Sequence, residues 1–186
     1  MINTASIINL ERLLNLGGVA GILSLLIVTL VMQFGFFDLP CPLCLLQRIG
    51  FFGMALGFIL NLRYGFRPSH YAVVLISALF TAFIALRQIA LHVIPDTGVY
   101  GMAIFEMHLY TWSFIVSVAA MVITTLLLSV DRQYEGNSEV IGGWRKVTNF
   151  MFLIFLSLLL INIGATFMLC GFQACESDPI YYKLFS

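Results

Sequence analysis

The sequence predicts an all-α polytopic membrane protein, with residues 1–186 forming one domain. Of the 186 residues, 61% are hydrophobic and only 10% are charged, whereas soluble domains carry roughly 45–50% apolar and about 25% charged residues. Five apolar stretches approach the roughly 20 residues that a helix needs to cross the hydrocarbon core. Helices are required there, because a backbone in lipid must satisfy its own hydrogen bonds. The basic residues between the stretches gather on one side, which predicts a fixed orientation.

The first predicted span covers residues 16–37. Its apolar run is longer than the roughly 7–15 residues of a signal-peptide core, and no small-residue cleavage site follows it. We therefore expect it to be retained as a membrane helix. Gly17 and Gly21 are four residues apart on this span and predict the close approach of a neighbouring helix.

The second predicted span covers residues 44–62 and follows a segment that contains prolines. Pro40 and Pro42 mark its entry, and proline is tolerated in the first turn of a helix. A second pair of glycines, Gly53 and Gly57, again predicts close helix packing.

The third, fourth and fifth predicted spans cover residues 71–93, 108–130 and 147–169. Gln88 and His92 are one helical turn apart on the third span, so they share a face of that helix. On this face they could help to line a pocket for a lipid-soluble ligand with a polar head, or they could form hydrogen bonds to a neighbouring helix.

The charged residues predict the orientation. Alternating crossings place six basic residues on one side, which the positive-inside rule identifies as cytoplasmic. The opposite side receives a single basic residue, Lys183. The N-terminus is therefore expected in the cytoplasm, and the tail of residues 170–186 outside. Acidic and basic residues number 9 each, which gives no indication of a nucleic-acid partner. The six cytoplasmic residues are Arg12, Arg63, Arg67, Arg132, Arg145 and Lys146.

Two cysteine pairs fall on the outer side. Cys41 and Cys44 lie at the start of the second span, and Cys170 and Cys175 follow the fifth. The outer face of a bacterial inner membrane is oxidising, so disulfides persist there. Cys41 is expected near a helix N-terminus, where unpaired N–H groups favour a thiolate. Because a thiolate is the nucleophile and the leaving group of disulfide exchange, all four cysteines are candidate catalytic residues.

Arg48 lies four residues after Cys44 and seven after Cys41, so the three residues share a helix face. Arg48 would sit about 6 Å deeper than Cys44, at about 1.5 Å per residue. A cation at that depth is costly and indicates a functional site. It could hold a thiolate or polarise the carbonyl of a ring that accepts electrons. The alternative is an arginine whose long side chain reaches the lipid headgroups.

The tail pair supports two interpretations. Cys170 and Cys175 are separated by a short loop that contains glycine, which can bring the two thiols together. They form either a structural disulfide that stiffens the tail or an exchangeable disulfide that meets a soluble partner.

The motif Cys41-Pro-Leu-Cys44-Leu-Leu-Gln-Arg48 resembles the signature at the start of the second helix in the DsbB family of bacterial inner-membrane thiol:quinone oxidoreductases. The resemblance implies a four-helix bundle, here with a fifth transmembrane helix. It also implies that ubiquinone or menaquinone reoxidises Cys41 and Cys44 and contacts Arg48. The implied function is the reoxidation of a DsbA-like periplasmic thioredoxin-fold protein, with electrons passing to the membrane quinone.

The chain departs from the family pattern at its second cysteine pair. Family members usually carry that pair between the third and fourth helices, whereas the corresponding loop, residues 94–107, has no cysteine. Either Cys170 and Cys175 take its place, or Cys41 and Cys44 exchange directly with the partner and the tail pair is structural.

Two other function classes compete with this interpretation. A metal-binding membrane protein could use the four outer cysteines as tetrahedral soft ligands, with His108 in reserve. We expect no metal site, because the oxidising compartment and the cation of Arg48 disfavour one. A non-catalytic membrane subunit would instead keep all four cysteines in structural disulfides.

Overall fold

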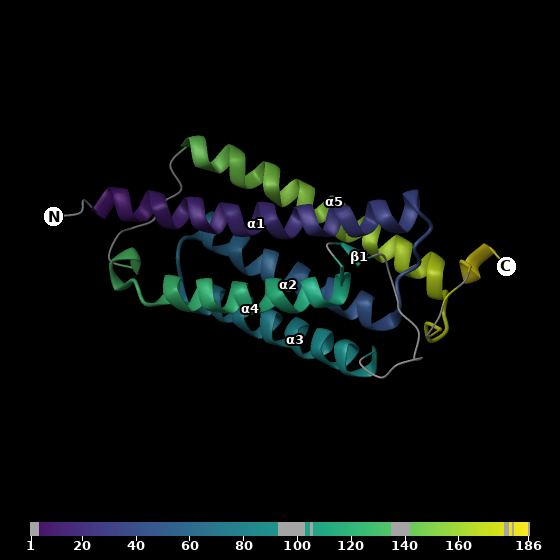
Figure 1. Ribbon diagram of the computed structural model, residues 1–186. Helices are drawn as coiled ribbons and strands as arrows, with labels where there is room; N and C mark the ends of the chain where they lie inside the picture. Colours follow the sequence, from purple (N-terminus) through teal and green to yellow (C-terminus); the bar gives the residue numbers. More distant parts are fainter. Residues whose placement is uncertain are drawn as a thin grey trace.

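The computed structural model describes residues 4–92, 103–104, 106–134, 142–176, 179 and 181–185. In this part of the chain, five helices are long and apolar enough to cross a membrane, which confirms the all-α polytopic class. The elements, shown in Figure 1, are α1 (Thr4–Gly35), α2 (Pro42–Tyr64), α3 (Pro68–His92), β1 (Ala103–Ile104), β2 (Met107–His108), α4 (Leu109–Leu128), the 3₁₀ turn η1 (Asp131–Tyr134), α5 (Gly142–Cys170) and the 3₁₀ turn η2 (Lys183–Phe185).

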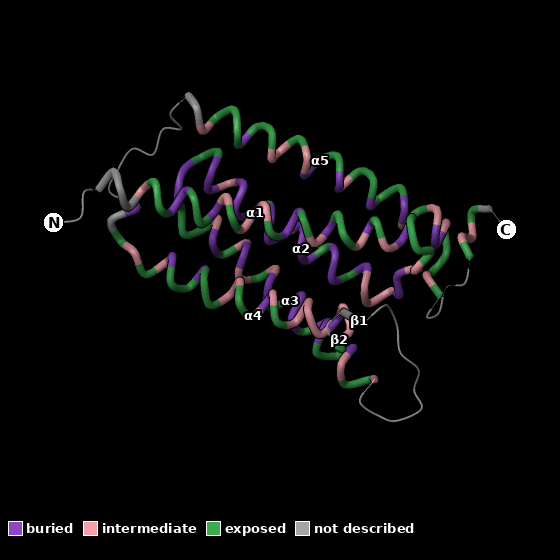
Figure 2. The backbone as a smooth tube through the Cα atoms, turned by 45° about the horizontal axis from the view of Figure 1, so that its top comes forward, coloured by how far each residue is buried: buried purple, intermediate pink, exposed green. Residues whose placement is uncertain are grey.

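The helices form an elongated bundle with the two chain termini at opposite ends (Figure 1). The second helix, α2, packs against α1, α3 and α5, while α4 packs against α3. Of the apolar window of α2, 61% is buried inside the protein, compared with 28% for α5, as the colouring in Figure 2 illustrates. Side chains on α2 therefore meet partners from three other helices.

The first helix starts earlier than the sequence predicts. It begins at Thr4 instead of residue 16, so Glu11 and Arg12 lie within the helix, and both are buried. The reason is that hydropathy marks only the apolar segment, whereas Leu, Glu and Arg are good helix formers that continue the helix beyond it. The fifth helix likewise begins before the predicted residue 147, at Gly142.

Glycines on α2 bring it close to α3. A Cβ atom added at Gly53 would meet the side chain of Ser77, and one added at Gly57 would meet the His70 carbonyl oxygen at 2.8 Å. The prediction that this pair allows close packing is confirmed. Gly50 belongs to the same face, because its added Cβ would overlap the Thr81 hydroxyl.

The glycine pair on α1 behaves differently. An added Cβ at Gly17 or Gly21 would meet no atom of the described residues within 4 Å. The prediction of close packing at these two positions is therefore wrong within the described chain. Gly18 makes the close approach instead, since its added Cβ would lie 3.0 Å from the Phe58 ring.

A short antiparallel ladder precedes α4. Ala103 pairs with His108, and Ile104 pairs with Met107. Residues 93–102 and 105 of the expected outer loop lie outside the described residues.

Candidate active site

The first thiol pair lies in the first turn of α2. Pro42 occupies that turn, and Cys41 is the N-cap residue with an extended backbone. The backbone N–H of Cys44 donates to Cys41 Sγ over 3.2 Å, as to a capping side chain. Both cysteines are free thiols in this structure. The predicted helix start beside Cys41 is confirmed.

Hydrogen bonding and burial both act on the Cys41 thiol. The side-chain hydrogen bond with Cys44, and then burial, raise the pKa of the Cys41 thiol above its ordinary value. The Cys44 sulfur interacts electrostatically with Arg48.

An amide from α3 lies against both sulfurs. Gln88 Nε2 is 3.4 Å from Cys41 Sγ and 3.5 Å from Cys44 Sγ. Gln88 Oε1 accepts a hydrogen bond of 2.7 Å from Gln47 Nε2 and lies 3.9 Å from Cys44 Sγ. The close packing of α2 on α3 thus carries Gln88 to the thiols.

Arg48 is buried in the protein, with 5% of its surface exposed. Its Nη1 donates to Gln33 Oε1 over 2.7 Å and to Asn162 Oδ1 over 3.3 Å, and its Nη2 donates to the Thr29 carbonyl oxygen over 3.2 Å. These partners come from α1 and α5, so the guanidinium is held inside the bundle and does not extend to the lipid headgroups. All three partners are neutral, so none of them cancels its charge.

A cavity of about 70 Å³ connects these groups. Cys41, Cys44 and Arg48 all line it, which agrees with the predicted shared face. We call it the thiol cavity. The remaining wall combines apolar side chains of α1 and α2 with polar groups of the α1–α2 loop and α4, including Leu26, Phe51, Asp38, Tyr110 and Ser113.

Residues 11–100 match the family model described as disulfide bond formation protein DsbB. The chain belongs to the DsbB family. The matched part contains the whole of α2 and α3, and with them Cys41, Cys44 and Arg48. No curated protein and no solved structure matches the chain.

The tail of this DsbB-family chain carries a disulfide between Cys170 and Cys175. Cys170 is buried in a small cluster with Leu45 and Leu169, and Tyr182 packs against that cluster. The second cysteine pair thus lies beside the residue that follows Cys44. Residues 177, 178, 180 and 186 of the tail lie outside the described residues.

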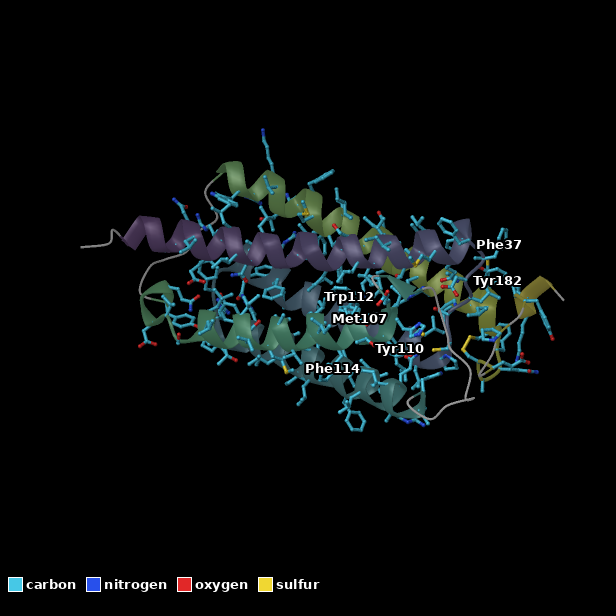
Figure 3. All side chains as sticks on the ribbon, in the orientation of Figure 1. Phe37, Met107, Tyr110, Trp112, Phe114 and Tyr182 are labelled. Carbon is cyan, nitrogen blue, oxygen red and sulfur yellow. A yellow bond between two sulfur atoms is a disulfide. The ribbon has the colours of Figure 1, made fainter. Side chains whose placement is uncertain are left out.

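The tail folds back onto the end of the bundle. Lys183 forms an ion pair of 3.1 Å with Glu176, and η2 packs against α5. Figure 3 shows Tyr182 at the same end of the bundle as Phe37, which lies in the connection between α1 and α2. The two cysteine pairs of this DsbB-family chain therefore share one end of the molecule.

Two histidines stack on the ring of a single tyrosine. His92 and His108 both stack on Tyr110, with ring centroids 5.4 and 5.3 Å apart. His92 Nδ1 also lies 2.7 Å from the Gln88 carbonyl oxygen. Among the described residues, no group of three or more His, Cys, Asp or Glu side chains is arranged to hold a metal ion.

Sequence reasoning missed three amides of the site, namely Gln33, Gln47 and Asn162. Each lies in an apolar helix and is buried. Polar side chains inside a membrane span are rare and point to function, so this signal was present. The sequence gives no information on which of them meets Arg48, because that depends on how the helices pack.

Proposed function

We propose that the chain is a thiol:quinone oxidoreductase of the bacterial inner membrane. In this proposal it reoxidises a DsbA-like periplasmic thioredoxin-fold protein and passes the electrons to ubiquinone or menaquinone. The observation that carries the proposal is the convergence of Cys41, Cys44 and Arg48 on one cavity. The coarser function, membrane-embedded disulfide bond formation, follows from the DsbB family.

The thiol step oxidises the partner and reduces this chain. A partner thiolate attacks one sulfur of a disulfide and forms a mixed disulfide, while the original S–S bond breaks and its electron pair stays on the other sulfur. The second partner thiol then attacks the mixed disulfide. The partner leaves with a disulfide, and this chain keeps two thiols.

We propose that the partner forms its mixed disulfide with the tail pair, Cys170 and Cys175. Its packing beside Leu45 supports a route in which the reduced tail pair passes its electrons to a Cys41–Cys44 disulfide by a second exchange. The alternative route, direct exchange between the partner and Cys41–Cys44, differs in its need for Cys170 and Cys175. Trapping of the mixed disulfide separates the two routes.

The residues around the thiol cavity suit a quinone headgroup. Leu26 and Phe51 offer apolar surface to a ring. Arg48, which lines the cavity, offers N–H donors to a carbonyl oxygen. A bound quinone would supply a two-electron acceptor. Sites for drug-sized ligands measure roughly 300–1,000 Å³, so binding requires lining side chains to move aside.

The positive charge of Arg48 is the main electrostatic contribution of the chain to the proposed reaction. A charge held by preorganised neutral groups in a water-poor site favours negative charge that develops nearby. Arg48 lies close enough to Cys44 and Asp38 to interact with both electrostatically. We assign to it the stabilisation of a thiolate on Cys44 and of the reduced acceptor.

The test uses the purified full-length protein, a reduced DsbA-like protein and a short-chain ubiquinone. Quinone absorbance and partner thiols are followed together. We expect one quinone to be reduced for each partner disulfide formed, and we expect Cys44→Ser to abolish both signals. Unchanged quinone reduction in Cys44→Ser would contradict the proposal and leave a structural role for the cysteines.

A further inference from the structure

Gln88 is a fully buried amide inside a membrane helix, with 0% of its surface exposed. Burying an amide costs free energy unless its polar atoms find hydrogen-bond partners. The nearest partners of its NH₂ group are the two sulfurs, at 3.4 and 3.5 Å. The nearly equal distances to Cys41 and Cys44 allow Gln88 to serve either sulfur.

Gln47 holds the oxygen end of the Gln88 amide. The two ends of an amide have similar shapes but opposite hydrogen-bonding character. Gln47 Nε2 donates to Gln88 Oε1 over 2.7 Å, and both side chains are buried. Because the oxygen is held by Gln47, the NH₂ group is directed at the sulfurs.

We propose that Gln88 is a catalytic residue that donates N–H hydrogen bonds to the sulfur bearing negative charge in the Cys41–Cys44 pair. Gln47 is the positioning residue that keeps these N–H groups aimed at the sulfurs. Neither role is part of the proposed function, but the contribution of Gln88 and Gln47 to turnover rests on that function.

Gln88 assists disulfide exchange at the sulfur that is released as a thiolate. An incoming thiolate forms a new S–S bond with one sulfur of the Cys41–Cys44 disulfide, and the electron pair of the broken bond stays on the other sulfur as a thiolate. The incoming dithiol is thereby oxidised and the pair reduced. A hydrogen bond to the leaving thiolate stabilises it, and a more stable thiolate leaves faster.

Other charged and titratable groups also surround the thiols, and neutral substitutions at Gln88 or Gln47 leave them in place. These groups come from α2, the loop before it, α3, α4 and the tail, and they are Arg48, Asp38, His92, Tyr110 and Tyr182. A difference between the parent protein and such variants therefore reports on the amides.

The experiment measures the pH dependence of thiol alkylation in the reduced full-length protein in detergent. Rates of reaction with iodoacetamide are followed at each cysteine by mass spectrometry. Gln88→Met keeps a similar volume but removes the N–H donors. We expect it to raise the apparent pKa of alkylation at Cys41 and Cys44 by about one unit, since a hydrogen bond to a charged group is lost.

Two further variants complete the test. Gln47→Met is expected to shift the profile in the same direction by a smaller amount, because Gln88 stays but loses its anchor. Gln133→Met is the matched control: Gln133 is buried too, but it bonds to Tyr71 and to the Leu127 carbonyl oxygen far from the thiols. We expect its profile to match that of the parent.

A folded Gln88→Met protein with the parent profile would overturn the assignment, and so would an equal shift in Gln133→Met. If Gln88→Met does not fold, Gln88→Asn takes its place, because the shorter side chain withdraws the amide from the sulfurs and should also raise the apparent pKa. The assay contains neither partner nor quinone, so its result is independent of the reaction proposed above.

Discussion

The residue that most shapes the site is Arg48, a cation buried among neutral acceptors. A buried charge is costly unless hydrogen bonds satisfy it, and here Gln33, Asn162 and the Thr29 carbonyl oxygen supply them. Because these groups carry no charge, the field of the guanidinium acts on Cys44, on Asp38 and on the thiol cavity that they line.

Replacing Arg48 should impair electron transfer more than thiol exchange. We expect Arg48→Ala to slow quinone reduction about 10²-fold, the usual effect of losing one charge-stabilising donor. Formation of the mixed disulfide with the partner should change little. Arg63→Ala serves as the control, because Arg63 is exposed at the opposite end of α2. Equal losses in the two steps would remove the role given to Arg48.

The two tail cysteines differ in accessibility, which predicts their order of use. Cys170 is buried, whereas Cys175 is partly exposed. Attack by a partner requires access to the sulfur, so we expect the mixed disulfide to form at Cys175. With an oxidised partner, the Cys175 thiolate of Cys170→Ser should attack the partner disulfide and hold the partner as an adduct on non-reducing gels, whereas Cys175→Ser should form no such adduct. An adduct at Cys41 or Cys44 when both tail cysteines are replaced would indicate direct exchange and a structural tail disulfide.

Among the elements, the contact between α2 and α3 depends on glycine. A Cβ atom at Gly53 would lie 2.9 Å from Ser77 Cβ, so a larger side chain must push the helices apart. We expect Gly53→Leu to destabilise the protein by about 1–3 kcal/mol, a typical cost of overpacking, and to lower its melting temperature in detergent. Gly21→Leu is the matched control and should melt like the parent, because an added Cβ there meets no described atom. Equal melting of both variants would show that the glycine face is not tightly packed.

The fifth helix supplies groups that the family-matched segment lacks. It lies outside residues 11–100, yet it brings Asn162 to Arg48 and the Cys170–Cys175 disulfide to the end of α2. We expect Asn162→Leu to slow quinone reduction by about tenfold, because one hydrogen bond to a charged group is lost while two acceptors remain. Thr166→Val, one turn further along, is the control, since the Thr166 hydroxyl donates within its own helix. Unchanged quinone reduction in Asn162→Leu would show that α5 does not tune Arg48.

At the scale of the whole molecule, the sequence predicted the features that depend on residues close together in the chain. Hydropathy located the five spans, and helical periodicity brought Cys41, Cys44 and Arg48 together, because all three lie within two turns of α2. The contacts of Gln88 and Asn162 could not be predicted in this way. They come from separate helices, and lipid provides no burial pattern that reveals which faces pack together.

The orientation of the bundle is the requirement on which the whole mechanism depends. Both cysteine pairs lie at one end of the molecule, and the proposal needs that end to face the oxidising compartment. The most direct measurement is labelling of intact bacteria with a membrane-impermeant maleimide after mild reduction, with mass spectrometry at each of the four cysteines. We predict that Cys175 is labelled from outside in intact cells. Labelling of Cys175 only in inverted membrane vesicles would place the pair on the cytoplasmic side and contradict the account.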